Sequence, residues 1–148
     1  VWVTSSSAQK IGKAVELGAK GGFLYTEDNW PKQFVEAAGA PSLVVDSAAG
    51  PTYDTLIDLV EMGGRIVNFG ATLGPADKFE IRKVFWKQLR LQGSTMGSPA
   101  DFEAMVQFNV EHGISPIVDS TYPLEEGNLA IEQMKTSPQF GKIVLTIE

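Results

Sequence analysis

The stretch SLVVDSAAGP, residues 42–51, decides how this chain is expected to fold. Residues 42–46 form a short apolar run that ends in an aspartate. Such a continuous run is typical of a strand in a parallel sheet that is covered on both faces. Gly50 and Pro51 then interrupt the chain, and residues 53–60 have the apolar spacing of an amphipathic helix. The stretch therefore predicts a strand, a turn and a helix, the repeating unit of an α/β fold.

The same alternation of strand and helix recurs on both sides of this stretch. We expect further strands at residues 1–4, 23–25, 65–69, 89–93, 117–122 and 142–147, and helices at residues 8–17, 30–38, 84–88, 99–112 and 124–135. Ser7 and Ser98 are suitable N-caps for two of these helices, and Gly18 and Gly113 are suitable stops. The order predicts a doubly wound parallel α/β sheet.

Composition excludes several classes of function. The 148 residues are 43% hydrophobic and 20% charged, as expected of a globular domain. There is no cysteine, and His112 is the one histidine, which excludes disulfides, thiolate metal sites and a multi-histidine zinc site within one chain. The net charge of −6 argues against a nucleic-acid partner. Since no apolar run approaches the length of a membrane span and no signal peptide is visible, we expect a cytoplasmic domain without a membrane partner.

Four stretches, taken in order, resemble the medium-chain dehydrogenase/reductase family, which includes zinc-type alcohol dehydrogenases and quinone oxidoreductases. They are VWVTSSSAQKIGKAVELGAKGGFLY (1–25), GGRIVNFGATLG (63–74), LRLQGSTMGS (89–98) and FGKIVLTI (140–147). The resemblance implies a Rossmann-like nucleotide-binding domain over residues 1–115. Residues 116–148 would be a strand-helix-strand that rejoins a catalytic domain. It also implies an NADP-dependent oxidoreductase that transfers hydride to or from a carbonyl, a quinone or an activated alkene.

Compared with the family, the chain lacks the first strand and its glycine-rich phosphate loop, because no GxGxxG occurs and residues 1–4 resemble the second strand. We therefore expect a C-terminal fragment that is inactive alone, with any zinc ligands of the parent outside this sequence. The first strand is central in the Rossmann sheet. We expect the sheet to close up over the slot, or a second chain to fill it, since exposed strand edges favour homodimers.

The resemblance also implies where a nicotinamide cofactor binds. Ser5, Ser6 and Lys10 follow the first strand at the place where an acidic residue binds the ribose of NAD. Hydroxyls and a lysine suit the 2′-phosphate of NADP; alternatively, the serines only cap a helix and the lysine is solvated. The other cofactor-binding candidates follow later strands or open the last one: Tyr25, Ser47, Phe69, Gly70, Ala71, Thr72, Ser94, Thr95, Met96 and Lys142.

These candidates have different implied roles. Tyr25 resembles a residue near the adenosine, residues 69–72 and 94–96 correspond to the nicotinamide side, and Lys142 resembles a lysine near the phosphates. Each also has a plain structural alternative, such as surface packing, a turn, a subunit interface or the opening of an edge strand. Asp46 is expected either at the site or as an acceptor for neighbouring backbone amides.

No catalytic residue or metal ligand is predicted within this chain. His112 is expected to interact with a helix dipole. Phe85 and Trp86 are expected to face the core beside a basic helix face. Two other functions stay open: an isolated domain that self-associates and binds nucleotide weakly or not at all, and a different Rossmann-like enzyme such as a methyltransferase, against which the serines at residues 5–7 count.

Overall fold

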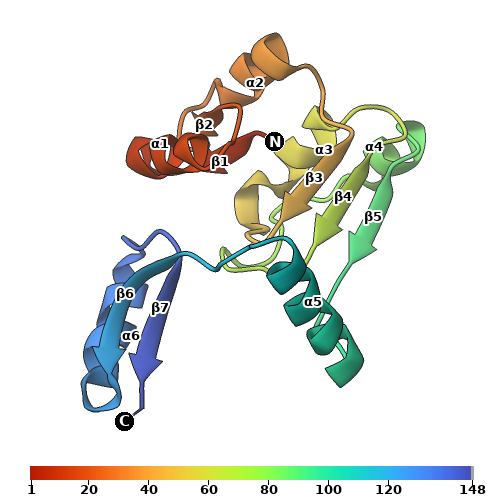
Figure 1. Ribbon diagram of the computed structural model, residues 1–148. Coiled ribbons are helices and arrows are strands. Elements are labelled where there is room, and N and C mark those ends of the chain that lie inside the picture. The colour runs from red at the N-terminus through yellow and green to blue at the C-terminus, as the bar shows by residue number, and fades with distance from the viewer. Residues whose placement is uncertain (148) are drawn as a thin grey trace. The chain divides into compact units, whose positions relative to one another are not determined.

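The computed structural model describes residues 1–147 and has the alternating order of strands and helices predicted from the sequence (Figure 1). The strands are β1 (Val3–Ser5), β2 (Gly22–Leu24), β3 (Leu43–Asp46), β4 (Arg65–Asn68), β5 (Arg90–Gly93), β6 (Val118–Pro123) and β7 (Lys142–Thr146). The helices are α1 (Ala8–Glu16), α2 (Trp30–Ala38), α3 (Tyr53–Leu59), α4 (Ile81–Trp86), α5 (Pro99–Glu111) and α6 (Gly127–Thr136), with 3₁₀ turns η1 (Gly50–Thr52) and η2 (Leu124–Glu126). The predicted α/β class is confirmed.

The helix ends follow from local chemistry. The hydroxyl of Ser7 accepts the N–H of Lys10 at 3.4 Å and starts α1, and Gly18 adopts a φ of +102° just after that helix ends. Ser98 and Asp101 form a reciprocal capping box at the start of α5. Because Asp101 accepts the N–H and hydroxyl of Ser98, the pKa of its carboxyl lies below its ordinary value. Both predicted N-caps are confirmed.

All strand pairs are parallel, and they form three sheets in the described chain: β1–β2, β3–β4–β5 and β6–β7. The chain divides into two compact units, Val1–Met96 and Gly97–Glu148. The first unit holds the sheets β1–β2 and β3–β4–β5, and the second holds β6–β7. The assignment of residues 1–115 to a nucleotide-binding domain stays a prediction.

The expectation that the sheet closes up over the missing strand is wrong within residues 1–147, because β1 pairs only with β2 and β3 pairs only with β4. The two sheets of the first unit are held together by side-chain packing, since no strand-to-strand hydrogen bonds join them within residues 1–147. Trp30 and Phe34 of α2 pack on Leu59 of α3, and Trp2 and Phe23 of the β1–β2 layer pack against the same cluster. The alternative, that a second chain fills the slot, stays a prediction.

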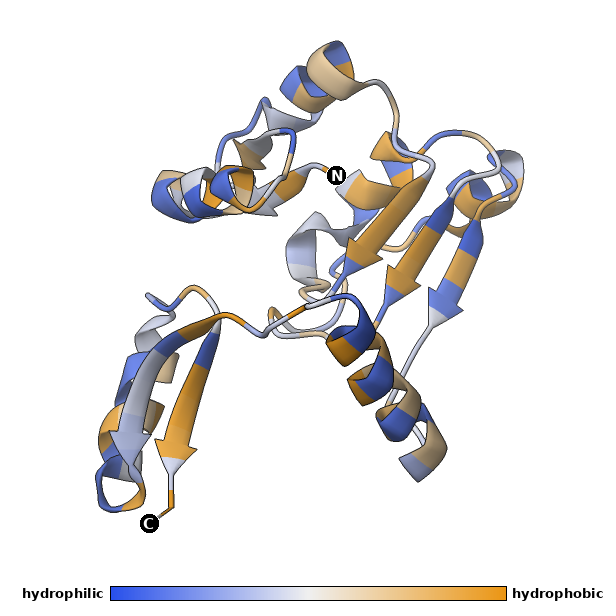
Figure 2. Ribbon diagram, viewed as in Figure 1, coloured by the Kyte–Doolittle hydropathy of each residue, from blue (hydrophilic) through white to orange (hydrophobic). Residues whose placement is uncertain are grey.

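The core of the first unit lies between α3 and the strands β3 and β4. Ile57, Val60 and Ile66 are fully buried there, and Val44 of β3 packs against them. The opposite side of β3 differs, because Leu43 and Val45 are 53% and 64% exposed. Within this unit β3 is therefore covered on one face rather than on both. Figure 2 shows that most of this strand is hydrophobic.

The expectation that Phe85 and Trp86 face the core is also wrong, since they are 60% and 77% exposed. The reason is that α4 docks through Lys83 and through Lys87, the residue that caps its C-terminal end. Lys83 binds carboxylates of α3, and Lys87 donates to the carbonyl groups of Ile57 and Asp58. The aromatic rings are left on the outer side.

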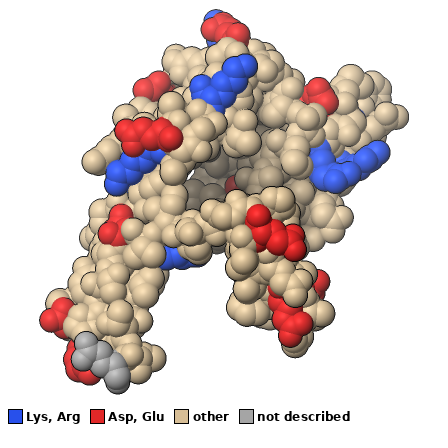
Figure 3. Space-filling model, in the orientation of Figure 1, with Lys and Arg blue, Asp and Glu red and all other residues tan. Residues whose placement is uncertain are grey.

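In the second unit, α6 crosses between the parallel strands β6 and β7. Ala130 of α6 is buried, and the amide of Gln133 in the same helix binds the hydroxyls of Ser120 and Tyr122 and the carboxylate of Asp119. None of the helices in the described part of the chain is long and apolar enough to cross a bilayer. On the face shown in Figure 3, acidic and basic side chains are scattered rather than gathered into one patch.

Candidate functional site

The carboxyl ends of β3, β4 and β5 lie side by side in the first unit. The register pairs Asp46 with Asn68 and Asn68 with Gly93, so the three following loops start at one edge of the sheet (Figure 1). Open α/β sheets bind ligands outside this edge. The topology brings together six of the predicted cofactor-binding residues there: Ser47, Phe69, Gly70, Ala71, Thr72 and Ser94.

Residues 47–50 and 69–74, which we call the paired loops, are bonded to each other through their backbones. The N–H of Thr72 donates to the carbonyl of Ser47 at 3.3 Å, and the N–H of Leu73 to that of Ala48 at 2.9 Å. The N–H of Gly50 donates to the carbonyl of Gly74 at 3.0 Å. The two loops therefore form one interlocked surface rather than two independent segments.

Gly70 allows the close approach of the paired loops. A β-carbon at this position would lie 2.7 Å from the carbonyl oxygen of Ser47, which is backbone and cannot swing away. Phe69, Ala71 and Thr72 beside it are exposed. The surface therefore offers an aromatic side chain, small residues and a hydroxyl to a ligand.

A partly buried polar network lies where β3 and β4 lead into the paired loops. The carboxylate of Asp46 accepts the N–H groups of Ala48 at 3.2 Å and Ala49 at 2.9 Å, and it accepts Nδ2 of Asn68 at 2.9 Å. The hydroxyl of Tyr53 donates to Oδ1 of Asn68 at 2.7 Å. Asp46 thus accepts hydrogen bonds from its neighbouring backbone amides, which was one of the two predictions for it. It also joins a side-chain network that was not predicted from the sequence.

Burial raises the pKa of the Tyr53 hydroxyl, and the nearby Asp46 carboxylate raises it further. The phenol is therefore held in its neutral, donating form. Neither Tyr53 nor Asn68 was a predicted site residue. The available signal was that Asn68 ends the strand next to the one that Asp46 ends.

A second group of predicted residues lies at the end of β1. We call residues 5–10 the β1 turn. The hydroxyl of Ser5 accepts the N–H of Ser7 at 3.2 Å, and the N–H of Tyr25 donates to the carbonyl of Ser5 at 3.1 Å. Ser6 is exposed, and Lys10 is half-buried on the first turns of α1. The structure therefore brings Ser5, Ser6, Lys10 and Tyr25 to one strand end.

The remaining candidates are less constrained. The N–H of Ser94 donates to the carbonyl of Asn68 at 2.8 Å, and Thr95 and Met96 continue from it as exposed residues. Lys142 opens β7 in the second unit, and its N–H donates to the carbonyl of Ile117 at 2.8 Å. His112 is the C-cap of α5 and packs on the ring of Phe108.

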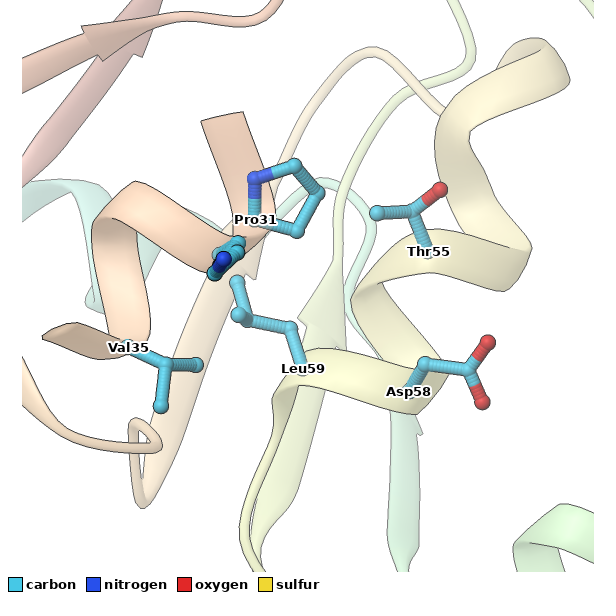
Figure 4. A pocket seen from close by; sticks show the side chains of 6 residues that line it. Pro31, Val35, Thr55, Asp58 and Leu59 are labelled. Carbon is cyan, nitrogen blue, oxygen red and sulfur yellow. The ribbon is translucent and has the colours of Figure 1, made fainter. Parts of the chain in front are cut away.

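A hollow of about 370 Å³ lies between α2 and α3, lined by Pro31, Lys32, Val35, Thr55, Asp58 and Leu59 (Figure 4). None of the predicted site residues lines it. Among residues 1–147, no group of three or more histidine, cysteine, aspartate or glutamate side chains could hold a metal ion. Residues 1–147 therefore do not fit a zinc site.

Comparison with protein families and sequences supports a common origin with known oxidoreductases. The family model described as zinc-binding dehydrogenase matches residues 1–111. The chain is 34% identical to the zinc-type alcohol dehydrogenase-like protein YogA of Leptosphaeria maculans, over 99% of this chain and 44% of that protein. It is 30% identical to an acryloyl-coenzyme A reductase of Metallosphaera sedula, over 71% of this chain and 32% of that protein.

Solved structures agree in fold. An NAD-dependent alcohol dehydrogenase superposes with a TM-score of 0.91 at 31% identity, over 100% of this chain and 44% of that one. A crotonyl-CoA carboxylase/reductase, AntE, in complex with NADP superposes with a TM-score of 0.85 at 24% identity, over 97% of this chain and 42% of that one, which shows the fold alone. The chain thus spans less than half the length of these relatives.

Proposed function

Because this chain belongs to the zinc-binding dehydrogenase family, we propose that it is the cofactor-binding part of an oxidoreductase that prefers NADP to NAD. The cofactor supplies the hydride chemistry when it is bound, and this chain's residues bind and orient it. We propose a carbonyl, a quinone or an activated alkene as the partner in hydride transfer. Relatives named alcohol dehydrogenase-like and acryloyl-coenzyme A reductase support the first and last of these classes.

The β1 turn is the observation that carries the preference for NADP. It places Ser6, which is exposed, and Lys10, which is half-buried, just after β1, and the sequence has no acidic residue before Glu16. An acidic residue at such a strand end would accept hydrogen bonds from a ribose 2′-OH, whereas hydroxyl and ammonium groups donate to a 2′-phosphate. The chemistry of the turn therefore suits the phosphorylated cofactor.

The paired loops supply the proposed surface for the nicotinamide side. Phe69, Ala71 and Thr72 are exposed above a network that already satisfies the buried polar groups of Asp46 and Asn68. A ligand can therefore be held by the surface residues without disturbing the buried ones. Residues on this chain would orient the cofactor and exclude water from one of its faces.

The test is a titration of NADPH and of NADH into the chain, followed by calorimetry. We expect tighter binding of NADPH, and we expect Lys10→Ala to reduce the preference about tenfold, the effect of losing one charge-assisted hydrogen bond. Lys32→Ala on α2 is the matched control, since that lysine is exposed and lies outside the β1 turn. An unchanged ratio in Lys10→Ala would overturn the NADP assignment, and no binding of either cofactor at millimolar concentration would overturn cofactor binding by this chain.

A second candidate is a domain that self-associates through its free strand edge. The exposure of Leu43 and Val45 on β3, a strand whose second edge is unpaired among residues 1–147, favours it. Light scattering recorded during the same titration separates the two candidates. A dimer that binds neither cofactor supports self-association alone.

A further inference from the structure

Asn68 lies where three strand ends of the first unit meet. It is in register with Asp46 of β3 on one side and with Gly93 of β5 on the other. Its side chain bonds to Asp46 and Tyr53, and its carbonyl accepts the N–H of Ser94 at 2.8 Å. One residue is therefore bonded to β3, to α3 and to the loop that follows β5.

The chemistry of this position requires an amide. Asp46 is almost fully buried, and an ionised carboxylate can only accept hydrogen bonds, so its partner must donate. The hydroxyl of Tyr53, which is also buried, donates from the other side, so that partner must accept as well. A side-chain amide has one donating and one accepting end, and Asn68 satisfies both neighbours at 2.9 and 2.7 Å.

The network is bonded to the paired loops through Asp46. The carboxylate that Asn68 binds also accepts the N–H of Ala49, whose φ of +51° lies in the left-handed region that residues other than glycine rarely adopt. The neighbouring Ala48 carbonyl accepts the N–H of Leu73 in the second loop. The strained backbone at Ala49 therefore persists because buried hydrogen bonds hold it.

We propose that Asn68 is a positioning residue, whose amide orients Asp46 and thereby fixes the paired loops in the shape that receives the cofactor. The inference rests on the proposed function for its ligand, and on the observed bonds for its mechanism. Asn68 is only partly exposed, and its side-chain amide is already bonded to Asp46 and Tyr53, so we expect it to act through the loops rather than by touching the cofactor.

The decisive variant is Asn68→Asp, which keeps the shape of the side chain but replaces the donor to Asp46 with a second carboxylate. At pH 7 two carboxylates in hydrogen-bond range repel, and we expect the amides of Ala49, Gly50 and Leu73 to lose about tenfold or more of their protection from hydrogen exchange. Near about pH 4 one shared proton restores a donor, and protection should return. Amide hydrogen exchange, measured by NMR on the isotopically labelled chain without cofactor, gives the protection of these amides at both pH values.

The charged surroundings do not obscure this pH response. Tyr53 of α3 is the titratable side chain that faces Asp46, and it stays neutral throughout this range. From β4 the neighbour is the uncharged Asn68, and from the loop it is the backbone of Ala48 and Ala49. The lysines of α4 bind to α3 instead.

Asn29→Asp is the matched control, because Asn29 is exposed in the same unit and its side chain makes no capping bond to α2. It should leave the three loop amides unchanged at both pH values. Tyr53→Phe is the second variant if Asn68→Asp does not fold at pH 7, since it removes one hydroxyl and leaves the bond from Asn68 to Asp46. We expect faster exchange at the same amides with Ile66 in β4 unaffected.

Wild-type protection of the loop amides in both variants overturns the proposal, as does a loss in Asn68→Asp that acid does not reverse. The exchange experiment needs no cofactor, so it decides the positioning role even if the chain binds neither nucleotide. If the wild type binds NADPH and Asn68→Asp binds it equally well with loosened loops, the loops are positioned by Asn68 but not for the cofactor.

Discussion

The paired loops and the β1 turn both follow parallel strands in the first unit, yet they are held by different means. The paired loops are bonded to each other and rest on a buried network of Asp46, Asn68 and Tyr53. The β1 turn depends on hydroxyl groups that accept backbone N–H at 3.2 and 3.4 Å, and much of it is exposed. The difference indicates that the two strand ends have different roles. The paired loops have a fixed shape, whereas the β1 turn is less constrained and carries the groups proposed to bind the ligand.

The largest effect that would sharpen this comparison is expected in the core beneath the paired loops. Ile66→Ala in β4 removes a fully buried side chain and should cost about 2–5 kcal/mol of the free energy of unfolding. Val3→Ala in β1 should cost clearly less, because Val3 is only half-buried. All three tryptophans (Trp2, Trp30 and Trp86) lie in the first unit, so urea unfolding followed by their fluorescence reports on this unit.

Val45→Ala is the control for the loss of an apolar side chain as such, since Val45 is largely exposed on β3. It should change the free energy of unfolding by a few tenths of a kcal/mol, about the usual range for surface changes. Equal losses in Ile66→Ala and Val3→Ala would contradict the view that the β3–β4 region is the more tightly built of the two.

The next effect concerns glycine-to-alanine substitutions, which should change the free energy of unfolding in opposite directions in the two regions. Gly70→Ala places a β-carbon against the carbonyl of Ser47, and we expect a loss of about 1–3 kcal/mol, as for other overpacked sites. Gly12→Ala in the interior of α1 meets no atom within 4 Å, and it should gain about 0.5–1 kcal/mol because alanine favours the helix. Thermal unfolding of the two variants in parallel measures both.

A gain in Gly70→Ala would show that the paired loops move apart easily and are not interlocked as their bonds indicate. A lower free energy of unfolding in Gly12→Ala would show that a neighbouring group lies against α1 at Gly12. Either result would weaken the contrast between a fixed and a tolerant strand end.

The sequence predicted most of the fold because the signals for it are local. The bounds of α2 were predicted to the residue, and Ser7 and Ser98 were identified as caps, since capping depends on residues three apart. The alternation of apolar strands with helical spacing was enough for the parallel α/β class. What these signals share is that a few neighbouring residues determine them.

The parts that were missed depend on contacts between distant residues. The bonds that Asn68 makes to Tyr53 and Asp46 span 15 and 22 positions, and nothing in their spacing distinguishes them from a cap or a solvated amide. The exposure of Trp86 depends on how the lysines of α4 bind to α3, which periodicity does not encode. The candidate site could therefore be located from the predicted strand ends in the sequence, whereas the network that supports it could be identified only in the structure.

The smallest expected effect distinguishes the two regions by pH. Since the pKa of the Tyr53 hydroxyl is raised above 10.0, the folded state holds its proton more tightly than the unfolded state does. The stability that this provides is fully present below pH 10 and is lost as the pH rises through the raised value. Tyr53→Phe should therefore be less stable than the wild type at neutral pH by about 0.5–1.5 kcal/mol, one hydrogen bond, and the gap should narrow above pH 10.

Ser7→Ala in the β1 turn is the counterpart without an ionisable group, and its loss of about 1 kcal/mol should stay constant over the same range. Lys83 and Lys87 also titrate in alkaline solution, with pKa values shifted in opposite directions by ion pairing and by burial. Both lysines are present in every variant, so their contribution cancels when each urea curve is compared with that of the wild type at the same pH.

A stability difference between Tyr53→Phe and the wild type that stays as constant with pH as that for Ser7→Ala would mean that the phenol ionises as freely in the folded chain as in the unfolded one. The network below the paired loops would then be open to water, and the contrast with the β1 turn would be lost.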